Sequence, residues 1–262
     1  MLLYLTLLFG WFSGFGSLAI SMSRMGCGET KGCLFKPAGC DPALDCTIAL
    51  IFFVDGPNSL RIEMMAQSLI PPPPLQYIAI GFSNDDSMGD DMVSECVLST
   101  NSEFAEAEVF LSNNIPNNRG NNRIYLTEEE RKTLFHNVTG EVVDGRLYCQ
   151  FSQQIIAQID ERDRIIRDLD HKYFILGATG SAQPNELNAH DTSRDSLFYP
   201  IVSDTAINPS RTGQQQFDLP PHFGAPPTES PQQINTLTSS VSSRCLIFSA
   251  VIVLLAVFIS FA

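Results

Sequence analysis

Two side chains of this 262-residue chain have the chemistry to hold a metal centre together, the thioether of Met88 and the imidazole of His190. Met88 follows the acidic turn 84–87, an unusual place for methionine, which normally fills hydrophobic cores. His190 follows the apolar segment 173–180 by ten residues, far enough for a loop to fold back over the edge of a sheet. A methionine sulfur and a histidine nitrogen can fill both axial positions of haem iron and raise its reduction potential. The pair therefore indicates electron transfer, although by pattern alone a methionine is more often a core or turn residue.

Other residues compete for these two roles. Met92 is the alternative sulfur, inside the next apolar segment, and His171 is the alternative imidazole. His136 adjoins a glycosylation sequon and is expected on the surface, whereas His222 lies in a proline-rich segment. The sequence has no Gly-x-Ser-x-Gly, phosphate-binding glycine loop or His-Glu-x-x-His motif, so neither hydrolysis nor phosphoryl transfer is indicated.

The acidic pairs around Met88 allow a second metal hypothesis. Asp85-Asp86 and Asp90-Asp91 offer carboxylate oxygens, the ligands that calcium prefers. Their spacing does not match a calcium-binding loop, so a solvated acidic turn is the favoured interpretation. Beside a bound haem, these carboxylates would repel anionic electron donors and attract cations.

The elements that position these residues are predicted to be short β-strands. Residues 77–82 alternate Tyr, Ala and Gly with Ile, Ile and Phe, the period of two that is typical of a strand. Short strands with turn signals every dozen or so residues predict an all-β fold, an immunoglobulin-like antiparallel β-sandwich. The expected strands are 47–54, 60–65, 76–82, 92–98, 108–111, 123–126, 141–151 and 173–178.

Two segments suggest short helices on this sandwich. Thr127 followed by three glutamates has the signature of a capped helical turn. Residues 155–169 place apolar side chains close to a helical spacing, and a strand followed by a charged loop is the alternative.

Cysteine usage indicates an oxidising compartment. Six cysteines between the two chain ends predict disulfides with 15 conceivable pairings. These residues are Cys27, Cys33, Cys40, Cys46, Cys96 and Cys149. Zinc is disfavoured because no Cys-x2-Cys pair occurs among them. A glycosylation sequon at Asn137 suits the same secretory route.

Composition divides the chain into four parts. Residues 1–21 resemble a secretory signal peptide, and 22–203 form the sandwich with a cysteine-rich entry, 22–45. Residues 204–243 are rich in Pro, Ser, Thr and Gln and are predicted to form a disordered stalk.

The apolar tail 244–262 predicts membrane attachment. Small residues at Ser239 and Ser240 match a glycosylphosphatidylinositol signal, with a single membrane span as the alternative. Either one places the functional part on the outer face of the plasma membrane. The net charge of −13 argues against nucleic acid or an anionic membrane surface as a partner.

An ordered set of motifs resembles the DOMON domain, in its ferric-chelate reductase-like branch. The motifs are 77–83, Met88-Gly89-Asp-Asp91-Met-Val93, Cys96-Val97, Cys149-Gln-Phe151 and 173–180 followed by His190, with Cys27-Gly-Glu-Thr-Lys-Gly-Cys33 upstream. In haem-binding members the resemblance implies a b-type haem held between the sheets by a methionine and a histidine. Met88 and His190 match those positions, and Tyr77, Ile80 and Phe82 are expected to pack on the macrocycle.

The resemblance also implies partners. Ascorbate, quinones or ferric chelates are the electron donors and acceptors it suggests. Full-length reductases of this branch carry a six-helix transmembrane cytochrome domain, which this sequence lacks, so the expectation is a surface electron relay rather than a self-sufficient reductase. A rival reading is a binding or assembly partner of membrane proteins without redox work, or a sugar-binding module.

Overall fold

The computed structural model describes residues 21–100, 107–116, 120–162 and 164–226. Chain contacts divide the protein into two compact units at Ala225/Pro226, and only Pro226 of the second unit is described. Residues 1–20 of the predicted signal peptide, the attachment candidates Ser239 and Ser240 and the apolar tail lie outside the described residues. Within those residues, no helix is long and apolar enough to cross a membrane.

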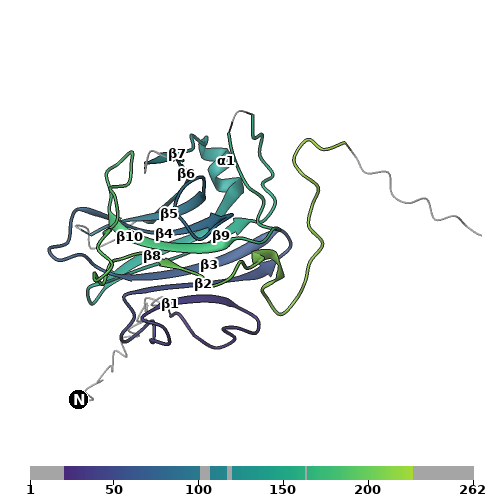
Figure 1. Cartoon of the computed structure of the whole chain (residues 1–262). Helices are drawn as coiled ribbons and strands as arrows, with labels where there is room; N and C mark the ends of the chain where they lie inside the picture. Colours follow the sequence, from purple (N-terminus) through teal and green to yellow (C-terminus); the bar gives the residue numbers. More distant parts are fainter. Residues whose placement is uncertain (1–20, 101–106, 117–119, 163, 227–262) are drawn as a thin grey trace, which may run out of the picture. The chain divides into compact units, whose positions relative to one another are not determined.

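Eleven strands form two antiparallel sheets that stack as the layers of a sandwich, which confirms the predicted fold class (Figure 1). The first sheet has the order β1-β2-β3-β9-β8 and consists of β1 (Gly32–Lys36), β2 (Ile48–Gly56), β3 (Ser59–Gln67), β9 (Arg146–Gln154) and β8 (Phe135–Val143). The second has the order β11-β10-β4-β5-β6-β7 and consists of β11 (Ile201–Val202), β10 (Phe174–Ser181), β4 (Leu75–Ser83), β5 (Met92–Ser99), β6 (Ala107–Asn114) and β7 (Asn121–Arg123).

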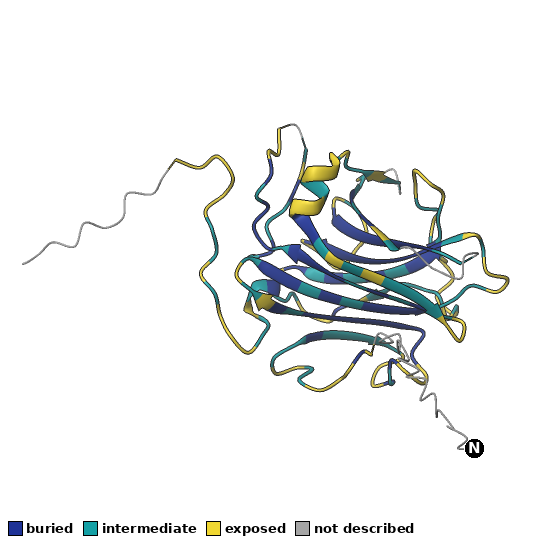
Figure 2. Ribbon diagram, turned by 180° about the vertical axis from the view of Figure 1, so that it is seen from behind, coloured by how far each residue is buried: buried dark blue, intermediate teal, exposed yellow. Residues whose placement is uncertain are grey.

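The core lies between the sheets and follows from the alternation of side chains along each strand. In β4, Ile78, Ile80 and Phe82 are fully buried in the inter-sheet core, and Tyr77 and Ala79 face the opposite side. Figure 2 shows buried residues concentrated on the strands and exposed residues on loops and on the helix. Fully burying one such isoleucine or phenylalanine contributes about 1.5–3 kcal/mol, so the inward faces of the strands supply most of the driving force for folding.

Three disulfides pair the six cysteines. Cys27–Cys33 and Cys40–Cys46 staple the entry segment, and Cys96–Cys149 joins β5 to β9 and so links the two sheets. The last bond closes a loop with a sequence separation of 53 residues. By the chain-entropy estimate, a loop of that length stabilises the fold by about 4 kcal/mol. A zinc site has no free thiolate here, because both sulfurs of the Cys40, Asp45 and Cys46 group belong to one disulfide.

The helical predictions have different outcomes. The capped turn is confirmed as α1 (Glu128–Leu134), in which the Thr127 hydroxyl accepts from the Glu130 amide and the Glu130 carboxylate accepts from the Thr127 amide. Described residues between 155 and 169 contain no helix. Their apolar side chains instead anchor an irregular loop in the core, where Leu169 donates its amide to the Ile155 carbonyl.

Most predicted strands are confirmed, with three differences. The entry segment contains β1, which pairs with β2 over its full length. The predicted strand 141–151 is a hairpin of β8 and β9, since Asp144 and Gly145 have φ of 50° and 69° and reverse the chain. Of 123–126 only Arg123 is in a strand.

The folded unit continues past Ser203, where a disordered stalk was expected to begin. Tyr173 and Ile207 exchange backbone hydrogen bonds of 2.8 Å, and the Val54 amide donates to the Thr212 carbonyl at 2.8 Å. The short helix η1 (Pro209–Arg211) lies between these contacts. Phe217 and Leu219 pack against the core. Composition failed here because a few well-spaced apolar residues suffice to dock an otherwise polar segment.

Candidate functional site

A cavity of about 700 Å³ lies on the outer face of the second sheet. Its floor includes Tyr77, Ala79 and Gly81 from β4, and Leu176 and Ala178 from β10. These side chains are largely apolar, and three of the five positions are Ala or Gly. The volume is within the range of about 300–1,000 Å³ that is usual for small-molecule and cofactor sites.

Met88 and His190 meet at this cavity, although 102 positions separate them in the sequence. Met88 lies in the turn between β4 and β5, and His190 lies in the loop after β10. The His190 Nε2 is 3.4 Å from the Met88 Sδ. Met88 is 47% exposed, which is high for a methionine and leaves its sulfur open to the cavity.

The hydrogen bonding of His190 defines what Nε2 can do. Its Nδ1 lies 3.0 Å from the Asp191 carbonyl oxygen, which can only accept, so Nδ1 carries the proton. In a neutral imidazole Nε2 is then a bare lone pair, and it faces the lone pairs of the Met88 sulfur. Two acceptor atoms in contact have no hydrogen between them, whereas a metal ion accepts electron density from both. A bond from Nδ1–H to a backbone carbonyl is also the usual way in which proteins orient a metal-binding histidine.

Several polar contacts attach the loop that carries His190 to the sandwich. Near its start, the Asn188 side chain donates to the Ser181 hydroxyl at 2.9 Å. Further along, the Lys36 ammonium at the end of β1 donates to the carbonyls of Ser196 (3.0 Å) and Tyr199 (2.7 Å). Burial lowers the pKa of Lys36, and the nearby Asp191 carboxylate partly offsets this effect.

The competing ligands lie elsewhere. Met92 is fully buried in the inter-sheet core, where its sulfur accepts from the Arg167 amide at 3.3 Å. His171 pairs with Asp170 and does not line the cavity. The other two histidines are also held elsewhere, His136 by Ser59 at 3.3 Å and His222 by Asp168 at 2.9 Å.

One expectation about the cavity is wrong. Ile80 and Phe82 do not line it, because they project from the other face of β4 into the core. Tyr77 does line it, as expected. The space between the sheets is filled by side chains, so the cavity beside Met88 and His190 opens on the outer face instead.

Charges at the cavity are few and of both signs. Arg194 is the single lysine or arginine among the lining residues, and no described residue pairs with it. Asp86 is the one lining carboxylate. On the same face of the sheet, burial raises the pKa of Glu95 despite its 2.9 Å ion pair with Arg123. Burial, with a smaller effect from Glu95, also raises the pKa of Tyr77.

Among the described residues, the carboxylates of the acidic turn do not gather into a group of three with metal-ligand spacing. The Asp85 carboxylate accepts from the Ser87 amide at 2.9 Å, and the Asp90 carboxylate pairs with Arg167 at 3.1 Å. Asp91 is buried and bonded within the turn. In the described part of the chain, the one group with metal-ligand spacing is the disulfide pair with Asp45.

Several site residues could not be found by sequence reasoning. Lys36 and Arg194 come from segments without any motif, and Lys36 lies about 160 residues from the loop it holds. The small residues of the floor did leave a signal, since Tyr77, Ala79 and Gly81 form one face of a predicted strand.

Comparison with known proteins agrees with this architecture. No protein-family model matches the chain. The chain is 27% identical over 177 residues to a ferric-chelate reductase 1 homologue of Drosophila melanogaster and 24% identical over 168 residues to ferric-chelate reductase 1 of Homo sapiens. It is also 26% identical over 178 residues to the DOMON domain-containing protein FRRS1L of Homo sapiens. These matches cover 67%, 64% and 68% of this chain.

The two-sheet sandwich and these relatives are consistent with a DOMON-type β-sandwich protein of the ferric-chelate reductase-like branch. The chain spans 25% of the length of each of the two reductase relatives and 53% of FRRS1L. The three disulfides and these relatives indicate a protein of the secretory pathway or the extracellular space.

Proposed function

We propose that this protein binds haem b with Met88 and His190 as axial ligands and works as an electron-transfer protein. The observation that carries the proposal is the 3.4 Å contact between the His190 Nε2 and the Met88 Sδ at the cavity. Bound haem would supply a one-electron change between ferric and ferrous iron. A redox-related role is supported at a coarser level by the ferric-chelate reductase relatives.

The cavity residues fit this cofactor in three respects. The soft sulfur and the borderline imidazole are an established axial pair for electron-transfer haem. The floor of Ala79, Gly81 and Ala178 offers apolar contact for the macrocycle. Arg194 offers a positive charge to the carboxylates that haem carries.

The partners of the electron transfer belong to the same proposal. Exposure of Met88 at the surface would let electrons pass without deep entry of the partner. Ferric chelates are one acceptor class, since two relatives are named as ferric-chelate reductases. Ascorbate or a quinone would serve as donor. We propose no self-sufficient reductase activity for the chain.

The location of the protein can be tested separately. We propose that it is held at the outer face of the plasma membrane through Ser239 or Ser240 by a glycosylphosphatidylinositol anchor. A phosphatidylinositol-specific phospholipase should then release it from intact cells, whereas retention after treatment would indicate a membrane span. Enzymatic removal of N-glycans should lower its apparent mass through Asn137, which is exposed on β8.

A haem titration tests the proposed function. The full chain, made through a secretory route, should bind haem at one equivalent and give a sharp Soret band with resolved α and β bands after reduction. Absence of a saturable spectral change, with the three disulfides intact, would contradict the proposal.

A further inference from the structure

We infer that the carboxylate of Asp91 is the positioning residue that aims the Met88 thioether at His190. The purpose of this arrangement rests on the proposed haem function, whereas its geometry does not. Asp91 is 1% exposed and directly precedes β5. It is therefore a buried carboxylate within three residues of a half-exposed candidate ligand, and a buried polar group needs hydrogen-bond partners to offset the loss of water.

The carboxylate ties the Met88 turn to the neighbouring strand. Its Oδ2 accepts from the Gly89 amide at 2.7 Å and from the Asn114 side-chain amide at 2.9 Å. Backbone bonds reinforce the tie, because the Asp90 amide donates to the Asn114 carbonyl and the Asn114 amide donates to the Asp91 carbonyl. The peptide that follows Met88 is thus fixed to the end of β6.

The turn needs such a tie because its backbone is unfavourable without it. Gly89 has φ of 146° and Asp90 has φ of 57°, both in the region that side chains disfavour. A methionine side chain also has three rotatable bonds and no fixed direction of its own. Release of the Gly89 amide would let the turn relax and let the sulfur move away from Nε2.

Hydrogen bonds from Asn121 in β7 orient the Asn114 side chain toward Asp91. The Asn121 side-chain amide donates to the Ser112 hydroxyl at 2.8 Å and to the Asn114 Oδ1 at 3.2 Å. The Asn114 oxygen is therefore engaged, so its nitrogen faces Asp91. Asn114 and Asn121 both line the cavity, which connects its wall to the turn that carries Met88.

A second attachment of the Met88 turn, between Asp90 and Arg167, is weaker than the Asp91 bonds. Arg167 donates to the Asp90 carbonyl at 2.6 Å and pairs with the Asp90 carboxylate at 3.1 Å. That carboxylate is 62% exposed, and water and salt screen such a pair. The buried Asp91 bonds therefore carry most of the positioning.

The test compares Asp91→Ala with the wild type in the haem-loaded full chain. Asp91→Ala should lose the sulfur-to-iron charge-transfer band, lower the reduction potential and bind added imidazole about tenfold more tightly, the scale expected when one hydrogen-bonded ligand contact is lost. Asp91→Asn keeps an oxygen that can accept from the Gly89 amide, so it should retain most of the band. Asp168→Ala is the matched control, since it removes another largely buried carboxylate that lies outside the cavity.

The outcomes separate this inference from the haem proposal. An Asp91→Ala protein with the charge-transfer band and potential of the wild type would overturn the positioning role. If the wild type binds no haem, hydrogen exchange still decides the matter without it. The Gly89 amide should exchange about tenfold or more faster in Asp91→Ala than in the wild type or in Asp168→Ala, as expected for the loss of one buried hydrogen bond. Equal Gly89 exchange rates in Asp91→Ala and the wild type would refute the proposed role of Asp91.

Discussion

At the scale of single residues, His190 is the side chain whose environment is most informative. Its Nδ1 is committed to the Asp191 carbonyl, and its Nε2 points at a sulfur rather than at a hydrogen-bond donor. This arrangement is the basis for the proposed role of His190 as an iron ligand.

Arg194 gives a prediction at the same scale. Arg194→Gln should weaken haem binding about two- to fivefold, as expected for an exposed charge pair worth roughly 0.5–1 kcal/mol. Binding of the haem dimethyl ester, which has no free carboxylates, should be unchanged. Equilibrium titration with both porphyrins measures the difference, and raised salt should reduce it.

Arg211→Gln is the control for this comparison, because Arg211 is exposed and does not line the cavity. Equal losses for haem and its diester in Arg194→Gln would mean that the arginine acts on the loop and not on the carboxylates.

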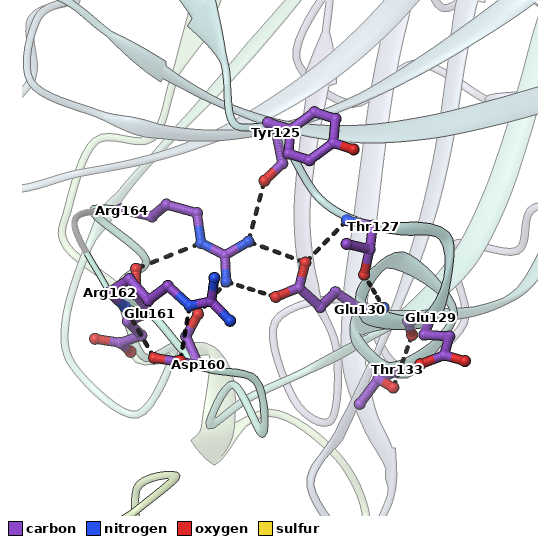
Figure 3. A network of polar contacts seen from close by, with 9 residues as sticks. All are labelled: Tyr125, Thr127, Glu129, Glu130, Thr133, Asp160, Glu161, Arg162 and Arg164. Atoms are coloured by element: carbon purple, nitrogen blue, oxygen red, sulfur yellow. Dashed lines mark hydrogen bonds and ion pairs between the residues drawn. The ribbon is translucent and has the colours of Figure 1, made fainter.

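At the scale of elements, α1 fastens the irregular loop before β10 to the sandwich (Figure 3). The Arg164 guanidinium donates to both oxygens of Glu130, at 2.7 and 3.1 Å, and also to the Tyr125 carbonyl. Glu130 accepts from the Thr127 amide as well, so one carboxylate caps the helix and holds the loop.

These bonds make the stability of the protein depend on pH. The Arg164 hydrogen bond, with the Thr127 backbone bond, lowers the pKa of Glu130 to about 2. In the unfolded chain the pKa of a glutamate such as Glu130 is about 4.3. The stabilisation is therefore fully present above that unfolded value and is lost as pH falls toward about 2.

Glu130→Gln tests this dependence. The melting temperature of the variant should lie below that of the wild type at pH 7, and the gap should close between about pH 4 and pH 2. Calorimetry at a series of pH values gives the comparison. A gap that stays constant down to pH 2 would show that the carboxylate charge is not involved.

Some secondary-structure elements could be predicted from the sequence, and others could not. Strand alternation identified β4, because one face of this strand lies in the core and the other does not. The loop 155–169 was ambiguous because its apolar residues dock individually into the core, and spacing along the chain does not report such contacts. Met88 and His190 could be proposed from residue chemistry and resemblance. The location of the cavity could not, since it depends on which face of β4 is covered.

At the scale of the whole molecule, the folded unit is larger than composition suggests. Residues 204–225 pack on the sandwich. Ile207 and Thr212 form backbone hydrogen bonds with it, and Phe217 is partly buried against the core. This segment contacts β2 and the residue before β10, so it supports both sheets.

Truncation tests this boundary. A chain that ends after Ala225 should unfold at the same denaturant midpoint as the full chain. A chain that ends after Ser203 should lose about 2–5 kcal/mol, because it forfeits several backbone hydrogen bonds and the burial of three apolar side chains. Equal midpoints for the two truncated chains would place the boundary at Ser203 after all.

The central claim is that one sulfur and one imidazole hold the same iron, and near-infrared magnetic circular dichroism of the haem-loaded ferric protein tests it most directly. The energy of the charge-transfer band in that spectrum depends on the two axial ligands. The account predicts a methionine–histidine band for the wild type, and a shift to different ligand types in both Met88→Ala and His190→Ala. An unshifted band in either variant would contradict it.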